Sequence, residues 1–283
     1  MKLVLLTDTH FLPAGRHVYG LDPRPRLEAA LAVIARDHAD AAALLVMGDL
    51  AHWGEDAAYR NLAEVLGTCP LPLLLMMGNH DKRGPFRAVF GTGHDDTDGF
   101  VQGVHRWPEL TLVRLDTLNE DSGNHAGYLC EKRLAFLEQA LREAPTDRPL
   151  IVAQHHPALT LGLPAMDAIK LLNGDAELAV FERAGRRPDL MLHGHVHRPI
   201  GGLWQGIPFH IQRALSHQVA FDETTDAFIP GSHEAPDLGL LRVEDGNVVI
   251  HTRSFLYDGP VYSMSDPVNV TATEPSGLLT LPR

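Results

Sequence analysis

Short apolar runs and segments of helical periodicity alternate along the first third of the chain. The apolar runs are rich in Leu, Val, Ala and Met, and they cover residues 2–7, 42–47 and 71–77. Runs of this length, bounded by polar residues, are typical of strands buried on both faces. Between them, residues 26–38 and 57–66 repeat apolar side chains near helical spacing. This alternation predicts parallel βαβ units and an α/β fold.

The rest of the chain continues the pattern less regularly. We expect two strands within residues 100–115, interrupted at Pro108, and a polar loop at 119–127. A helix is expected at 131–142, and further strands at 149–153 and 189–192. Later strand-like segments, which suggest a second sheet closing with antiparallel strands, cover residues 199–203, 207–214, 238–243 and 248–255. Because no repeat or linker interrupts these segments, we predict one domain over residues 1–258. A Pro-rich tail without a clear element follows at 259–283.

Polar side chains follow five of the predicted strands. The clusters are Asp8-Thr9-His10, Gly48-Asp49, Gly78-Asn79-His80-Asp81, His155-His156-Pro157 and His193-Gly194-His195-Val196-His197. Each cluster taken alone is compatible with an ordinary turn. Because the carboxyl ends of parallel strands share one edge of a sheet, we expect all five to meet there. Carboxylate, amide and imidazole groups bind hard or borderline divalent cations, so the sequence predicts a shared metal site.

Composition restricts the partners of such a site. The chain has 283 residues, of which 45% are hydrophobic and 21% charged, as in ordinary globular proteins. Its net charge of -12 would repel duplex nucleic acid and anionic membranes. Cys69 and Cys130, the 2 cysteines, provide neither a disulfide framework nor a thiolate metal site. No apolar run reaches the ~20 residues needed to span a bilayer, and no export signal is visible. We therefore expect a cytoplasmic protein.

The ordered motifs Asp8-x-His10, Gly48-Asp49, Gly78-Asn79-His80-Asp81, His155-His156-Pro157 and Gly194-His195-x-His197 resemble those of calcineurin-like metallophosphoesterases. Tyr19-Gly20, Met166-Asp167 and His217-Gln218 extend the resemblance to the branch of class III cyclic-nucleotide phosphodiesterases and bacterial glycerophosphodiesterases. The resemblance covers the chain from end to end. It implies a four-layer αββα sandwich, in which two mixed β-sheets are flanked by helices, and it makes residues 1–258 the catalytic domain.

The resemblance also implies two divalent metal ions per subunit. The residues implied for one metal are Asp8, His10, Asp49 and His197, and those for the other are Asp49, Asn79, His155 and His195, so that Asp49 bridges. Two divalent cations, two carboxylates and a bridging hydroxide leave a local charge of about +1, which matches a phosphodiester monoanion. Oxygen and nitrogen ligands without sulfur admit Mn, Fe, Zn or Co, and of these we expect Mn or Fe.

Other residues receive roles outside the metal ligands. His80 is implied near the leaving group as a proton or hydrogen-bond donor, and Asp81 either orients His80 or caps the following turn. Asn79, His52 and His217 are candidate substrate contacts. Because a strand residue and its successor point to opposite sides, we expect only one of His155 and His156 to reach the metal, and the resemblance implies that it is His155. The histidines without motif context are interpreted as surface or satisfied polar groups: His17, His38, His94, His105, His125, His210, His233 and His251.

The predicted activity is hydrolysis of small phosphodiesters, either 3′,5′-cyclic nucleotides or glycerophosphodiesters, by attack of a metal-bridging hydroxide. One alternative is a phosphomonoesterase of the same superfamily, but Leu50 to Gly54 lack the Arg that clamps phosphate in the Ser/Thr phosphatases. The other alternative is a catalytically inactive scaffold, but such a protein is expected to have lost metal ligands. Residues 159–174 carry many apolar side chains, which fit either an ordinary connection packed on the core or a lid that also contacts a neighbouring subunit in a homo-oligomer.

Overall fold

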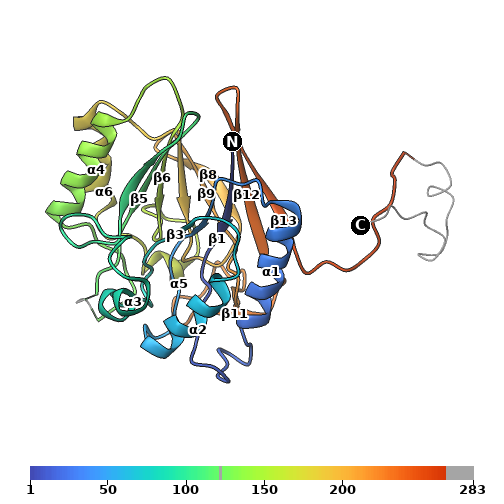
Figure 1. Ribbon diagram of the computed structural model, residues 1–283. Coiled ribbons are helices and arrows are strands. Elements are labelled where there is room, and N and C mark those ends of the chain that lie inside the picture. The colour runs from blue at the N-terminus through green and yellow to red at the C-terminus, as the bar shows by residue number, and fades with distance from the viewer. Residues whose placement is uncertain (121–122, 266–283) are drawn as a thin grey trace.

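The computed structural model describes residues 1–120 and 123–265 (Figure 1). The strands are β1 (Lys2–Leu6), β2 (Ala43–Val46), β3 (Leu73–Leu75), β4 (Gly103–Arg106), β5 (Thr111–Leu115), β6 (Leu150–Gln154), β7 (Leu190–His193), β8 (Ile200–Trp204), β9 (Ile207–Ile211), β10 (Gln218–Val219), β11 (Gly231–Ser232), β12 (Asp237–Glu244) and β13 (Asn247–Ser254). The helices are α1 (Arg24–Asp37), α2 (Asp56–Leu66), α3 (Arg83–Phe90), α4 (Glu131–Glu143), α5 (Pro164–Asp167) and α6 (Gly174–Ala184).

Two mixed sheets lie between two layers of helices (Figure 1). One sheet has the order β13-β12-β1-β2-β3, and the other has the order β4-β5-β6-β7-β9-β8. Apolar residues of β1 and β2 alternate between the two faces, so that Leu3 and Leu5 pack against the second sheet while Val4 and Leu6 pack against the helices. Helices α4 and α6 cover the outer face of the second sheet. The predicted four-layer sandwich is confirmed.

The late strands do not form a second sheet of their own, so that part of the prediction is wrong. β12 pairs antiparallel with β1, and β13 pairs with β12, which places both at an edge of the first sheet. β9 pairs parallel with β7, and β8 follows it in the second sheet. Local alternation predicts a strand but carries no information on its distant partner, because pairing is set by packing across the core.

Helices α3 and α6 were not predicted. α3 begins at Arg83-Gly84-Pro85 and buries only Phe86 fully, which leaves little apolar periodicity to detect. α6 buries its Glu177 together with Val180 and Phe181, so a charged residue occupies a core position. None of the helices in the described part of the chain has the length and apolar character needed to cross a membrane.

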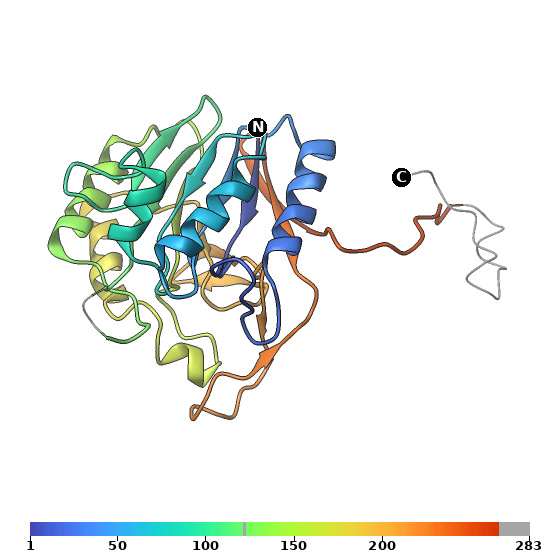
Figure 2. The same cartoon turned by 60° about the horizontal axis from the view of Figure 1, so that its bottom comes forward.

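The loops after β1, β2, β3, β6 and β7 converge at one edge, where the two sheets meet. The amide of His10 donates to the carbonyl of Asp49 at 2.9 Å, which ties the loops after β1 and β2 together. The amide of Gly194 donates to the carbonyl of His155 at 3.1 Å and does the same for β6 and β7. Beyond β13 the described chain extends away from the sheets (Figures 1 and 2). Of the predicted tail at 259–283, residues 266–283 lie outside the described residues.

Candidate metal centre

The backbone is strained at the residues whose side chains converge on this edge. Five of the eight described non-glycine residues with positive φ are candidate ligands: Asp8 (52°), His10 (46°), Asp49 (49°), His195 (68°) and His197 (55°). Residues other than glycine rarely adopt this left-handed conformation, and it persists only where the surrounding structure imposes it. The loops are therefore held in costly conformations that aim these five side chains.

Gly194 permits a close approach between the two sheets. A Cβ at this position would collide with the side chains of Thr7 and Asp8. The missing side chain brings the amide of His195 within 3.2 Å of Asp8 Oδ1. A glycine is therefore required where the loop after β7 crosses the end of β1.

One cluster of donor atoms contains four buried side chains. Potential ligand atoms of Asp8, His10, Asp49 and His197 all lie within 4.8 Å of one another. Nε2 of His197 is 3.1 Å from Nε2 of His10 and 3.2 Å from Oδ1 of Asp8. Nε2 of His10 is 3.5 Å from Oδ2 of Asp49. These are the four residues predicted for one metal.

A second cluster lies on the other side of Asp49. Asn79 Oδ1 is 2.8 Å from Nδ1 of His195 and 3.2 Å from Nε2 of His155. Burial lowers the pKa of His155, but the charge and hydrogen bond of Asp49, the charge of Asp8 and the carbonyl of Met47 together outweigh burial and raise that pKa to about 9. The buried Nε2 of His195 has no hydrogen-bond partner among the described residues. These residues are the ones predicted for the second metal.

Asp49 joins the two clusters through a single oxygen. Its Oδ2 lies 3.5 Å from Nε2 of His10 in one cluster and 3.5 Å from Nε2 of His155 in the other. Its Oδ1 accepts a hydrogen bond from the amide of His80 at 2.9 Å. The carboxylate is thereby held between the two clusters.

Hydrogen bonds at the opposite ring nitrogens leave Nε2 of three histidines available as ligands. Nδ1 of His197 donates to the carbonyl of His217 at 2.8 Å, and Nδ1 of His155 donates to the carbonyl of Met47 at 2.7 Å. Nδ1 of His10 lies 3.0 Å from Nδ1 of His52, and burial, with the nearby His80, lowers the pKa of His52 to about 4. Such contacts orient the imidazole ligands of metals, so the donor set fits two divalent cations.

His52 lies behind His10 and is only 3% exposed. Its ring contacts His10 on one side and stacks on His80 at a centroid distance of 4.9 Å on the other. This placement favours a role in orienting His10 over the predicted contact with substrate.

His156 does not point away from the cluster, so the argument from strand alternation is wrong. β6 ends at Gln154, and beyond it the rings of His155 and His156 both approach His195, with centroids 5.2 and 4.6 Å away. Both nitrogens of His156 are nevertheless hydrogen-bonded. Nδ1 lies 2.7 Å from the Thr117 hydroxyl, and Nε2 donates to the carbonyl of His125 at 3.2 Å. His155 is the better ligand because its Nε2 faces Asp49 and Asn79, which are candidate ligands themselves, whereas both nitrogens of His156 bind groups outside the clusters.

Asp81 joins three chain segments through hydrogen bonds and does not orient His80. Its carboxylate accepts hydrogen bonds from the amides of Leu50, Ala51 and Gly78 and from the hydroxyl of Tyr59. His80 is held elsewhere, because its Nδ1 donates to the carbonyl of His52 at 2.7 Å. These donors all precede Asp81 in the chain, so the structure supports neither of the two expected roles, orienting His80 or capping the following turn.

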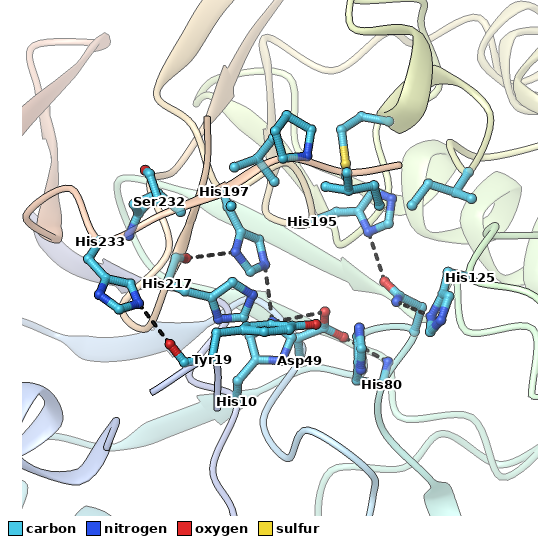
Figure 3. A pocket seen from close by; sticks show the side chains of 18 of the residues that line it. His10, Tyr19, Asp49, His80, His125, His195, His197, His217, Ser232 and His233 are labelled. Atoms are coloured by element: carbon cyan, nitrogen blue, oxygen red, sulfur yellow. Dashed lines mark hydrogen bonds and ion pairs between the residues drawn. The ribbon is translucent and has the colours of Figure 1, made fainter. Parts of the chain in front are cut away.

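A cavity of about 690 Å³ opens over both clusters (Figure 3). His217, a predicted substrate contact, lines it, as do Asn79 and His80. The sequence analysis missed His125, His233 and Trp53, which also line it. No motif marks these residues, since they lie in loops outside the ligand clusters. Among the described residues that line this cavity, none is Lys or Arg.

The segment 159–174 both packs on the core and reaches the cavity. Leu163 and Leu171 are buried in the apolar core between the second sheet and helices α4 and α6, whereas Met166 and Ile169 line the cavity. The carboxylate of Asp167 accepts the amides of residues 161–163 and closes a turn. The buried side chains fit an ordinary connection packed on the core, whereas the lid and its contact with a neighbouring subunit stay predictions.

Comparisons with known proteins agree with this geometry. The model of the calcineurin-like phosphoesterase family matches residues 1–199. A probable cyclic nucleotide phosphodiesterase of Rhodopseudomonas palustris is 57% identical over 268 residues, which are 95% of this chain and 97% of that protein. A probable glycerophosphodiester phosphodiesterase of Arcobacter nitrofigilis is 27% identical over 267 residues, 92% of this chain and 96% of that protein.

Among solved structures, a purple acid phosphatase from yellow lupin superposes with a TM-score of 0.64 at 15% identity. The match covers 92% of this chain and 52% of that one. At this identity the likeness concerns the fold alone.

Proposed function

Since the chain belongs to the calcineurin-like phosphoesterase family, we propose that it is a metal-dependent phosphodiesterase for small phosphodiesters, with 3′,5′-cyclic nucleotides as the first candidates. The observation that carries the proposal is the position of Asp49, whose single oxygen lies at 3.5 Å from one histidine of each donor cluster. The relative at 57% identity bears the name of a cyclic nucleotide phosphodiesterase. The relative at 27% identity keeps glycerophosphodiesters as second candidates.

Asp8, His10, Asp49 and His197 would hold one divalent cation, and Asp49, Asn79, His155 and His195 the other. Two such ions supply a nucleophilic water at neutral pH and neutralise charge on a phosphoryl group. The oxygen and nitrogen donors are compatible with Mn, Fe, Zn and Co, and we propose Mn or Fe. His217 and Asn79 line the cavity where substrate would lie.

The role that we assign to His80 is to serve the leaving group. Its Nδ1 is occupied by the carbonyl of His52, so Nε2 is the nitrogen left to face substrate. Its amide is bonded to Asp49, which keeps the ring at a fixed position beside the bridging carboxylate. A proton delivered from Nε2 would stabilise a departing alkoxide.

Two alternatives are less well supported. A phosphomonoesterase must bind a dianion, yet the described residues lining the cavity include no Lys or Arg to offset the second charge. An inactive scaffold would not be expected to keep all seven candidate ligands, five of them in strained backbone conformations.

We therefore expect selectivity for diesters over monoesters. The manganese-loaded protein should hydrolyse bis(p-nitrophenyl) phosphate with a kcat/KM at least about tenfold above that for p-nitrophenyl phosphate, because a site of local charge near +1 matches a monoanion. Steady-state kinetics on both esters, with cyclic nucleotides and glycerophosphodiesters alongside, measure this. Higher efficiency on the monoester would support a phosphomonoesterase instead.

We further propose that residues 159–174 form part of the mouth of the cavity and that the protein is a homo-oligomer. Met166 lines the cavity, and Leu172 and Met264 are 56% and 87% exposed. We expect Met166→Ala to change the ratio of kcat/KM between cyclic nucleotides and glycerophosphodiesters about threefold or more, since only one apolar contact of ~1 kcal/mol is lost. A monomeric mass by light scattering at micromolar concentration, together with an unchanged ratio, would remove both parts of this proposal.

A further inference from the structure

His125 lies at the cavity wall beside Asn79 and His80, although no motif in the sequence marks it. Figure 3 shows His125 and His80 on the same side of the cavity, opposite Ser232 and His233. The rings of His125 and His80 stack with centroids 4.7 Å apart and planes inclined by 27°. The cavity over the metal clusters therefore presents two neighbouring imidazoles.

The hydrogen bond to Asn79 fixes which nitrogen of His125 carries a proton. Asn79 Nδ2 lies 2.8 Å from Nδ1 of His125, and an amide nitrogen can only donate. Nδ1 of His125 is therefore an acceptor, and the proton of the neutral ring is on Nε2. The same bond turns Oδ1 of Asn79 toward His155 and His195, where the second metal would be held.

The loop that carries His125 is anchored at its backbone. The carbonyl of His125 accepts a hydrogen bond from Nε2 of His156 at 3.2 Å. Gly127 packs so closely on the ring of His156 that a Cβ there would approach it to 2.6 Å. These contacts hold the backbone of His125 against the edge formed by the loop after β6.

We propose that His125 is a second imidazole donor to the substrate, whose Nε2–H binds a non-bridging oxygen of the phosphoryl group while its Nδ1 orients the amide of Asn79. This inference rests on the proposed function. His125 cannot deliver a proton, because loss of the Nε2 proton from a neutral ring would leave an imidazolate. It differs in this respect from His80, whose Nδ1 already donates to a carbonyl and whose Nε2 can gain and lose a proton. His125 therefore stabilises negative charge on a non-bridging phosphoryl oxygen, and His80 donates a proton to the leaving group.

The test compares His125→Ala and His125→Asn with the matched control His251→Ala, which changes an exposed histidine of β13. We expect His125→Ala to lower kcat about 10²-fold, the loss typical for one preorganised donor to a developing anion. The loss should be equal for cyclic nucleotides and for bis(p-nitrophenyl) phosphate, and inorganic phosphate should inhibit at least about tenfold more weakly. His125→Asn, which offers both an acceptor and a donor, should recover part of the activity.

Nitrogen NMR of the zinc-loaded protein gives a readout independent of turnover, and it should show His125 as the Nε2–H tautomer. A loss that shrinks on p-nitrophenyl esters, an Nδ1–H tautomer, or unchanged phosphate inhibition in both variants would overturn the inference. If His125→Ala does not fold, His125→Asn carries the same comparison. Failure of the proposed function would look different, since the wild-type protein itself would then hydrolyse no small diester.

Discussion

The Asp49→Asn variant is expected to lose at least one metal ion per chain and to fall in turnover by about 10² or more. The substitution keeps the shape of the side chain but removes the charge of an oxygen that lies 3.5 Å from a ligand of each cluster. The amide can still accept from the amide of His80, so the local fold should persist. Metal analysis of protein purified without chelator, together with steady-state kinetics, measures both effects.

Asp189→Asn is the matched control for this substitution. Asp189 caps the start of β6 by accepting the amide of Leu150, far along the strand from the cavity. We expect that variant to keep its metal and its turnover. Two metal ions per chain with near-normal turnover in Asp49→Asn would show that Asp49 does not bridge.

The His80→Ala variant is expected to retain its metal and to lose turnover by roughly 10² to 10⁴ on alkyl diesters and cyclic nucleotides. His80 contributes its backbone amide to Asp49, and this contact survives the loss of the ring. On p-nitrophenyl diesters the loss should be much smaller, because a good leaving group departs with little need of a proton. Kinetics on the two ester classes, with metal content measured on the same samples, separate chemistry from metal binding.

An equal loss on poor and good leaving groups would exclude the leaving-group role of His80. His125→Ala provides a contrast, because that variant is expected to lose the same factor in turnover on esters with poor and with good leaving groups. The two stacked imidazoles can therefore be distinguished by one series of esters.

The candidate site could be predicted because its residues follow buried strands whose apolar runs are unmistakable. Asp8 and Asp49 come directly after runs continuous in Leu and Val, and the parallel arrangement forces their side chains to one edge. His125 could not be found in this way. It lies in a loop that no strand positions, and contacts with His156 and Asn79, which the sequence does not reveal, place it at the cavity.

The fold was predicted less completely toward the C-terminus. The strand character of β9 and β12 is visible in their alternation, but β9 pairs with β7 and β12 with β1. These partners are far apart in sequence, and packing across the core selects them. His156 shows the same limit on a smaller scale, since alternation predicts side-chain direction only while the strand lasts, and β6 ends two residues earlier.

Hydrolysis of 3′,5′-cyclic AMP by chelator-treated protein, followed as Mn²⁺ is added back in measured equivalents, tests the central claim most directly. We expect no turnover without metal and full turnover only after about two equivalents are bound, because two clusters share Asp49 and act on one phosphoryl group. Hydrolysis that persists without metal, or that saturates after one equivalent, would contradict the dinuclear account.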